Sequence, residues 1–321
     1  MNKNKINLNI NLYSYGYSLN FLNLKIKKMN LDNLLKKHSK LDLNGIELPI
    51  DTLFSKINKF DDFYNKFSKK YKFYICFDDI TNLNYNYLDY FNKLNIKNIR
   101  VRMPQDYNTV YGGNKFLIKK YKKNLNKFKN ILNKYKNYFL KNNFFFCIEN
   151  HQDLNSYDLI EIINELGSDF IGINWDIGNS IACGETPHDF FKNASKYIRN
   201  IHLKDYDIYF NGKIVKLNRV PLGKGYLKNI NIKKFINHNA SKSIELGAQV
   251  SRKCFVSNKR YWQFYNFDKI KIQRYYKFII KNKNQKDNIS DYEKNYSSKI
   301  IKNNEFNDFV SSYNYIRDYL K

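Results

Sequence analysis

Four short apolar runs between residues 144 and 245 each end in a side chain that can bind a metal ion. Each run has the length of a buried strand and is too short for an ordinary helix. The runs cover residues 144–149, 171–176, 199–202 and 242–245, and they end in Glu149, Asp176, His202 and Glu245. Three carboxylates and one imidazole form an oxygen-rich ligand set that suits one divalent ion, with manganese, magnesium or cobalt favoured over zinc.

The spacing of these four residues matches the repeat of an eight-stranded barrel. The intervals are 27 residues (149 to 176), 26 (176 to 202) and 43 (202 to 245). A strand and its return helix take roughly 30 residues in a (β/α)8 barrel of ~250 residues. We attribute the longest interval to an inserted loop over residues 206–228. Because parallel strands of a barrel end at one face, the four side chains should converge there.

The segments around these residues closely resemble the xylose isomerase-like TIM-barrel superfamily of sugar (phosphate) isomerases and epimerases. They are, in order, residues 148–153 (IENHQD), 175–180 (WDIGNS), 201–205 (IHLKD), 220–225 (VPLGKG) and 243–248 (SIELGA). The resemblance extends from about residue 5 to about residue 265 and is strong from 144 to 250. Lys224 is a departure, since many relatives carry Glu between the two glycines. If that Glu affects substrate choice, the substrate of this protein differs.

Spacing and resemblance together predict a (β/α)8 TIM barrel over residues 1–255. A helical C-terminal extension over residues 256–321 is expected to pack on the barrel or to form an interface in a homo-oligomer.

The resemblance implies a divalent-metal-dependent isomerase or epimerase of a sugar or sugar phosphate, which transfers a proton through a metal-stabilised enediolate. Relatives that epimerise ketoses use two matching glutamates, one on each face of the reacting carbon. Glu149 and Glu245 would therefore be catalytic as well as metal ligands, and Asp176 and His202 would be ligands only. A dehydratase or lyase stays open as an alternative, because it begins with the same proton removal.

Five further polar residues are candidates for substrate binding: His151, Asn179, Lys204, Arg219 and Arg102. His151 and Asn179 each follow an expected ligand closely enough to reach substrate hydroxyls. Lys204 either binds an oxyanion or is solvated. Arg102 either reaches an anionic substrate or forms a buried salt bridge. Glu47, at the end of an expected strand, fits a site role and a structural salt bridge equally well.

The remaining elements follow from hydrophobic periodicity. Strands are expected at 5–12, 43–48, 72–77 and 98–103, and helices at 30–39, 51–68, 84–93, 114–141, 153–166, 187–197 and 230–238. Aromatic runs around Asn211-Gly212 indicate a hairpin that should overhang the barrel mouth and border the substrate. The chain beyond Gly247 contains no Gly or Pro. Residues 249–255 and much of 263–321 are therefore expected to be helical.

The chain is strongly basic, with 56 Lys and Arg against 29 Asp and Glu and a net charge of +27. Such a charge fits a nucleic-acid or anionic-membrane partner. However, only eight of the basic residues are Arg, and the lysines are scattered. The abundance of Lys, Asn, Ile, Tyr and Phe therefore points to an AT-rich genome, and we expect neither a specific nucleic-acid partner nor a membrane partner.

An apurinic-site endonuclease of the same superfamily is the nucleic-acid alternative. Its phosphodiester chemistry needs three metal ions and therefore many His and Asp ligands. This chain has five histidines, and Asn179 stands where a further His ligand would be expected. The sequence disfavours this activity.

Cysteine usage and hydropathy suggest a cytoplasmic protein. Cys76, Cys147, Cys183 and Cys254 are far apart and form no Cys-x-x-Cys pair, which suits a reducing compartment. The N-terminus lacks the apolar core of a signal peptide, and no stretch of about 18 apolar residues occurs.

Overall fold

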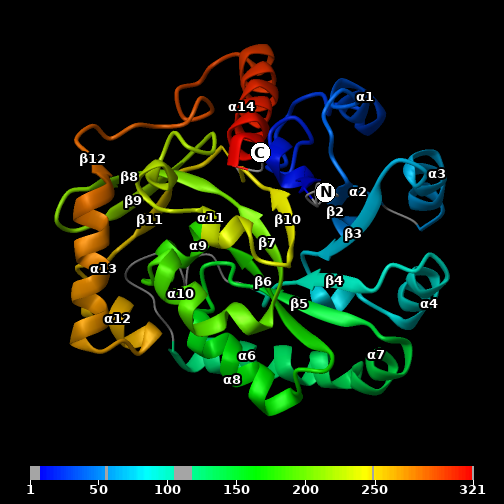
Figure 1. The fold of residues 1–321 in the computed structure, drawn as a ribbon, viewed down its shortest axis with the longest axis horizontal. Helices are drawn as coiled ribbons and strands as arrows, with labels where there is room; N and C mark the ends of the chain where they lie inside the picture. Colours follow the sequence, from blue (N-terminus) through cyan, green and yellow to red (C-terminus); the bar gives the residue numbers. More distant parts are fainter. Residues whose placement is uncertain (1–7, 55–56, 105–117, 248, 320–321) are drawn as a thin grey trace, which may run out of the picture.

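The computed structural model describes residues 8–54, 57–104, 118–247 and 249–319. Eight parallel strands close into a barrel in the order β1, β10, β7, β6, β5, β4, β3, β2 (Figure 1). Their bounds are Leu8–Asn11 (β1), Gly45–Pro49 (β2), Lys72–Phe77 (β3), Asn98–Val101 (β4), Phe145–Glu149 (β5), Ile171–Asp176 (β6), Ile198–Leu203 (β7) and Ser241–Ile244 (β10). The barrel confirms the expected fold class, and all eight strands lie where the sequence predicts them. Residues 5–7 of the first expected strand lie outside the described part.

Helices on the outside cover the barrel, so both faces of its strands are buried. They are Leu31–Lys37 (α1), Ile50–Leu53 (α2), Ile57–Phe67 (α3), Tyr85–Lys93 (α4), Ile118–Lys134 (α6), Lys136–Asn142 (α7), Ser156–Leu166 (α8), Pro187–Ala194 (α10) and Lys233–Ile236 (α11). A shorter helix, Ile177–Ala182 (α9), follows β6 directly. The helices predicted at 51–68 and 114–141 are each split in two, and residues 114–117 lie outside the described part.

Capping residues in the sequence mark the first turns of several of these helices. The side chain of Asn155 accepts hydrogen bonds from the N–H groups of Tyr157 and Asp158, and the carboxylate of Asp158 accepts one from the N–H of Asn155. This reciprocal pair satisfies backbone donors that the first turn of α8 would otherwise leave unpaired. Thr186 caps α10 in a similar way, with Pro187 at the first helical position.

A second, four-stranded sheet adjoins the barrel. The predicted hairpin is confirmed as Asp205–Phe210 (β8) and Val215–Val220 (β9), which pair antiparallel. Gly212 has a φ of 87°, which favours glycine. Oδ1 of Asn211 accepts hydrogen bonds from the N–H groups of Lys213 and Ile214, which stabilises the turn.

The segment after β10 differs from the sequence prediction. Residues Arg252–Cys254 form a strand (β11) on the free edge of β9, and Lys283–Asn284 (β12) pairs with β8. The helix predicted at 249–255 is therefore wrong. The lack of Gly and Pro permits a helix there, but pairing with the open edge of β9 satisfies backbone groups that an edge strand would leave exposed.

Three helices complete the chain: Lys259–Tyr265 (α12), Lys269–Asn282 (α13) and Ser298–Tyr319 (α14). The expectation that much of 263–321 is helical is confirmed by α13 and α14, while residues 285–297 between them contain no helix. Helix α14 packs beside β10 and the turn Leu12–Tyr15, where the eighth outer helix of a TIM barrel lies (Figure 1). Among the described helices, none is both long and apolar enough to cross a bilayer.

Candidate metal centre and adjoining cavity

The four expected ligands come together at the carboxyl-terminal face of the barrel. Glu149 and Asp176 are the last residues of β5 and β6, His202 is the penultimate residue of β7, and Glu245 follows β10. Each offers one ligand atom, and these atoms all lie within 4.8 Å of one another. All four residues are buried, and because their ligand atoms lie so close together they could hold a metal ion.

Glu47 holds the ring of His202 on the side opposite Glu245. Its Oε1 lies 2.7 Å from Nε2 of His202, while Nδ1 of the same ring lies 2.8 Å from Oε2 of Glu245. The amide of Asn200 donates to the other oxygen of Glu47 at 3.1 Å. Burial alone would lower the pKa of His202, but Glu47 and Glu245 raise it well above its ordinary value. Of the two sequence interpretations of Glu47, the structure shows the salt bridge, and this salt bridge orients an expected ligand.

Arg100 pairs with Glu149, a contact that sequence reasoning missed. Its guanidinium binds Oε2 of Glu149 and lies 3.1 Å from Oδ1 of Asp78. The other oxygen of Glu149, Oε1, accepts a hydrogen bond from the amide of Asn179 at 3.2 Å. Burial raises the pKa of Glu149, and Arg100 opposes that shift. The only sequence signal for this pair was the position of Arg100 two residues before Arg102, on the same face of its strand.

Lys204 pairs with Glu245 as Arg100 pairs with Glu149. Its Nζ lies 2.6 Å from Oε1 of Glu245 and also pairs with Oδ2 of Asp176. Lys204 is fully buried, so the interpretation of a solvated side chain is wrong. Burial would raise the pKa of Glu245, but Lys204 and His202 hold it well below its ordinary value. Each glutamate thus has one oxygen held by a cation and the other turned toward the ligand set.

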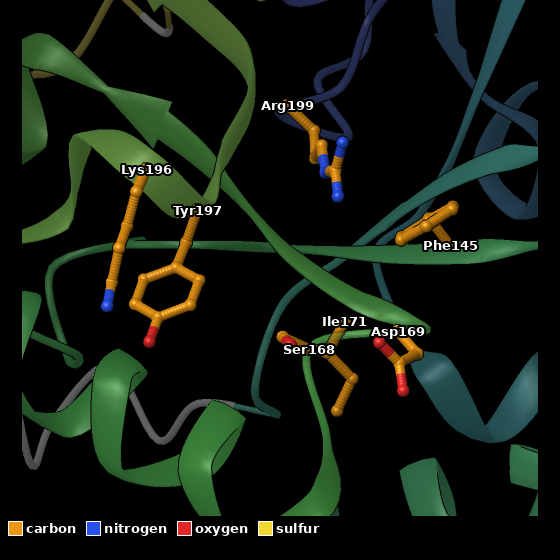
Figure 2. A pocket seen from close by; sticks show the side chains of 7 residues that line it. All are labelled: Phe145, Ser168, Asp169, Ile171, Lys196, Tyr197 and Arg199. Carbon is orange, nitrogen blue, oxygen red and sulfur yellow. The ribbon is translucent and has the colours of Figure 1, made fainter.

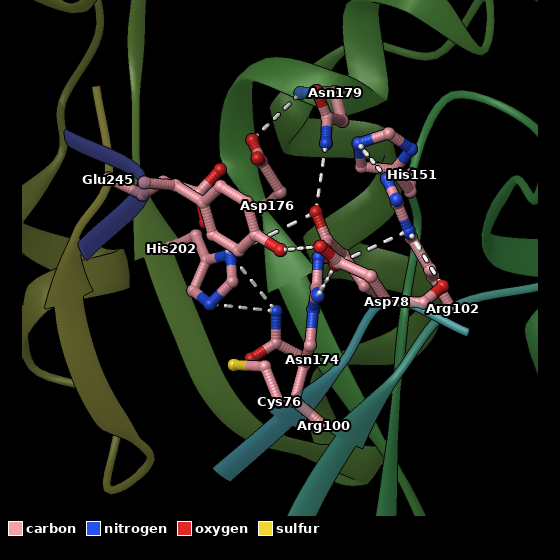
Figure 3. A network of polar contacts seen from close by, with 12 residues as sticks. Cys76, Asp78, Arg100, Arg102, His151, Asn174, Asp176, Asn179, His202 and Glu245 are labelled. Carbon is pink, nitrogen blue, oxygen red and sulfur yellow. Dashed lines mark hydrogen bonds and ion pairs between the residues drawn. The ribbon is translucent and has the colours of Figure 1, made fainter. Parts of the chain in front are cut away.

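A cavity of about 840 Å³ adjoins this group. Its lining includes Glu245, Arg100, Arg102 and His151, so two of the expected substrate-binding residues are brought to the site. Figure 3 shows Arg102 and His151 beside Asn179 and the ligand residues. Nη1 of Arg102 lies 3.3 Å from Nε2 of His151, and its Nε donates to the backbone oxygen of Asp78 at 3.2 Å.

The hairpin β8–β9 does not line this cavity, contrary to the sequence prediction. The wall comes instead from the turn after β1, including Tyr13 and Phe21, and from residues 250–253, Phe255 and Glu293 of the C-terminal region. The hairpin carries β11 on its edge, and β11 in turn presents Arg252 to the cavity.

Arg219, an expected substrate-binding residue, lies away from the four expected metal ligands. On β9 it lies 3.1 Å from Asp308 and 3.7 Å from Glu305 of α14, and it does not line the cavity. Asp205, the neighbour of Lys204 in the sequence, contacts the loop after β9. Its carboxylate accepts the N–H groups of Gly223, Gly225 and Leu227 and so orders the loop after β9.

That loop contains Lys224, the residue that departs from the pattern of the resembled family. A Cβ at Gly225 would come within 2.2 Å of the backbone oxygen of Tyr206, so only glycine fits there. Lys224 itself is exposed to solvent and does not line the cavity.

A second hollow, of about 330 Å³, lies at the opposite end of the barrel (Figure 2). Phe145 and Ile171, which begin β5 and β6, line it together with Arg199 near the start of β7. It is therefore separated from the ligand group by the length of the strands.

The comparisons with known proteins agree with this geometry. The sequence matches the family described as xylose isomerase-like TIM barrel over residues 84–242. A 60-residue stretch is 33% identical to the uncharacterized protein YihM of Escherichia coli strain K12. That stretch is 19% of this chain and only 18% of the relative.

Solved structures with the same fold include sugar epimerases. D-psicose 3-epimerase from Clostridium cellulolyticum H10, solved with D-tagatose, is 13% identical with a TM-score of 0.52, covering 86% of this chain and 97% of its own. The 3-keto-D-glucoside 4-epimerase of E. coli is 11% identical with a TM-score of 0.50, covering 75% of this chain and 92% of its own. At these identities the likeness shows the fold alone. Residues 84–242 are identified by this match, together with the closed barrel, as a xylose isomerase-like TIM barrel.

Proposed function

We propose that the protein is a divalent-metal-dependent isomerase or epimerase acting on a sugar or sugar phosphate. The observation that carries this proposal is the arrangement of Glu149 and Glu245 around one buried ligand group. Each has one oxygen beside a cation and one toward the group, and Glu245 also faces the cavity. The epimerases among the solved structures of this fold support the same reaction class.

The residues present fit a divalent ion. Glu149, Asp176, His202 and Glu245 would hold it, and a carboxylate-rich set favours manganese, magnesium or cobalt over zinc. Glu47 bonds the ring nitrogen of His202 that faces away from Glu245, which is the outer contact that metal-binding histidines usually make. When bound, such an ion would act as a Lewis acid on the substrate carbonyl and so acidify the adjacent C–H group.

The two glutamates would move the proton. One carboxylate takes the proton from the carbon beside the carbonyl, the C–H electron pair forms a double bond to the carbonyl carbon, and the carbonyl π pair moves onto its oxygen. In an epimerase the other glutamate, which carries a proton at this stage, gives it to the opposite face of the same carbon, and the carbonyl forms again. In an isomerase the proton goes to the neighbouring carbon, a hydroxyl proton moves between the two oxygens, and the carbonyl forms at the other carbon. Such general acid–base catalysis typically contributes ~10²–10⁴-fold to the rate.

Other side chains would orient the substrate. Arg102 and His151 line the cavity, and Asn179 holds Glu149. Arg100 and Lys204 hold the carboxylates of Glu149 and Glu245 in place through buried ion pairs.

The test is a screen of ketoses and their phosphates for deuterium uptake from solvent, with Mn²⁺ or Mg²⁺ added. Metal-dependent exchange of one C–H beside the carbonyl, with formation of an epimer or isomer, supports the proposal. Formation of an unsaturated product with loss of water would instead assign a dehydratase. No exchange with any ketose, together with cleavage of abasic duplex DNA, would assign the endonuclease.

A further inference from the structure

Four cationic side chains from three parts of the chain lie around the four expected ligands and the adjoining cavity. Arg100 lies on β4, Arg102 directly after it, Lys204 after β7, and Arg252 on β11. His151 is only 8% exposed. Its Nε2 lies 3.3 Å from Nη1 of Arg102, and Arg100, Arg102 and Arg252 all line the cavity beside it.

Two of these cations are committed to the ligand group. Arg100 pairs with Glu149, and Lys204 pairs with Glu245 and Asp176. Arg102 lies against Asp78, with 3.5 Å between Nε and Oδ1. Arg252 comes from the C-terminal region that follows the barrel strands, and it lines the cavity together with its neighbour Lys253.

Arg252 also lies close to the proposed catalytic carboxylate. Its Nη1 is 3.5 Å from Oδ1 of Asn179, whose amide nitrogen is 3.2 Å from Oε1 of Glu149. One amide side chain therefore separates the guanidinium from Glu149. Pairing of β11 with β9, with Arg252 opposite Leu217, fixes the backbone from which this side chain extends.

We propose that Arg252 binds an anionic substituent, a phosphate or a carboxylate, on the sugar substrate. A guanidinium presents a planar set of donors that matches either group with two hydrogen bonds. Asp78 offsets the charge of Arg102, but Arg252 and Lys253 add two positive charges to a wall whose further acidic residue is Glu293, and this balance favours an anion in a cavity of low dielectric. The inference rests on the proposed function for identifying the ligand as a substrate.

Binding measurements on the metal-loaded protein test the inference. The probes are D-tagatose, D-tagatose 6-phosphate and D-tagaturonate, which share a ketohexose skeleton and differ in charge. We expect at least one anionic probe to bind 10-fold or more tightly than D-tagatose by calorimetry. The Arg252→Gln variant should bind that probe about 10- to 100-fold more weakly, the range expected for loss of a hydrogen bond to a charged group.

The control is Arg260→Gln, which removes the same charge from an exposed position near the start of α12. It should leave the affinity for all three probes unchanged, and Arg252→Gln should leave the affinity for D-tagatose nearly unchanged. The preferred anionic probe distinguishes a phosphate from a carboxylate.

Equal affinities for the three probes, absence of binding by both anionic probes, or an unchanged affinity in Arg252→Gln would overturn the inference. Deuterium uptake into the same probes separates it from the proposed function. Arg252-dependent anion binding without any exchange would contradict the proposed reaction but not the anion site. Exchange that is insensitive to probe charge and to Arg252 would contradict the anion site alone.

Discussion

Oε1 of Glu47 lies 2.7 Å from Nε2 of His202, on the side of the ring that faces away from Glu245. These residues are 155 positions apart in the chain and meet because β2 and β7 belong to one closed barrel. Because a carboxylate only accepts hydrogen bonds, Nε2 is the nitrogen that donates to Glu47, and Nδ1 is the nitrogen that would bind a metal ion. The contact therefore fixes the orientation of the ring and would fix its tautomer when a metal ion replaces the proton on Nδ1.

This relationship predicts that Glu47→Gln weakens metal binding. Loss of such an outer contact typically lowers metal affinity about 10- to 100-fold. Competition with a fluorescent chelator measures the affinity for Mn²⁺. Glu185→Gln is the matched control, since Glu185 is a buried glutamate that accepts hydrogen bonds from Ser156 and lies outside the ligand group. Equal affinities in the two variants would remove Glu47 from the metal centre.

Removal of Lys204 should destabilise the fold. Its ammonium is fully buried between Asp176 and Glu245, and breaking a buried ion pair on one side costs about 3–5 kcal/mol. We expect Lys204→Met to lose that much free energy of unfolding in urea with a chelator present. Part of the loss should return on adding Mn²⁺, because the ion would again neutralise both carboxylates.

Lys216→Met is the control for this loss. Lys216 pairs with Asp287, whose side chain is 45% exposed, so its removal should cost less than about 1 kcal/mol. A loss in Lys204→Met no larger than that of the control would show that Lys204 does not stabilise the two carboxylates.

The stability should also depend on pH through His38. Burial lowers the pKa of His38 from 6.5 to about 4. Its Nε2 bonds the hydroxyl of Tyr15, and its ring packs against Phe309 of α14. The unfolded chain therefore binds a proton between pH 6.5 and 4 that the folded chain does not. The stability that neutral His38 contributes is therefore fully present above pH 6.5, the pKa of the unfolded chain, and is lost as the pH falls toward the folded pKa of about 4.

Between pH 7 and pH 5 this group should remove about 2 kcal/mol from the free energy of unfolding. The measurement compares urea unfolding of the wild type and His38→Gln at both pH values. The variant should lack that part of the decrease. Parallel pH dependences in the two proteins would show that His38 titrates alike in the folded and unfolded states.

The convergence of Glu149, Asp176, His202 and Glu245 could be predicted because it depends on local features. Each of these residues ends a short apolar run, and parallel strands that close into a barrel bring their ends together. The partners of the ligands could not be predicted in this way. Glu47 and Arg100 contact His202 and Glu149 across the barrel, from strands that are distant in the sequence.

The cavity wall was harder to predict than the ligand group. Proximity in sequence suggested that the hairpin β8–β9 borders the substrate, but the wall includes Arg252, from a segment expected to be helical. A strand of three residues leaves too short a pattern to be distinguished from a helix. It forms because β9 offers an open edge, and that edge exists only in the folded protein.

Helix α14 explains why Arg219 lies outside the site. Glu305 is fully buried in this helix and accepts the N–H groups of Tyr17 and Ser18, both at 2.9 Å. The same carboxylate lies 3.7 Å from Arg219. The sequence of β9 contains no signal for this partner, which lies more than 80 residues further along the chain.

The most direct test of the account replaces Glu149 and Glu245 by Gln, one at a time. A glutamine can still offer an oxygen to the metal ion but cannot accept the proton. Turnover of the ketose that shows exchange should fall by ~10²–10⁴-fold in each variant, even with metal saturating. Direct metal analysis should meanwhile show that both variants retain the ion. Recovery of near-normal turnover in both variants on adding excess metal would contradict the account, because the glutamates would then be ligands only.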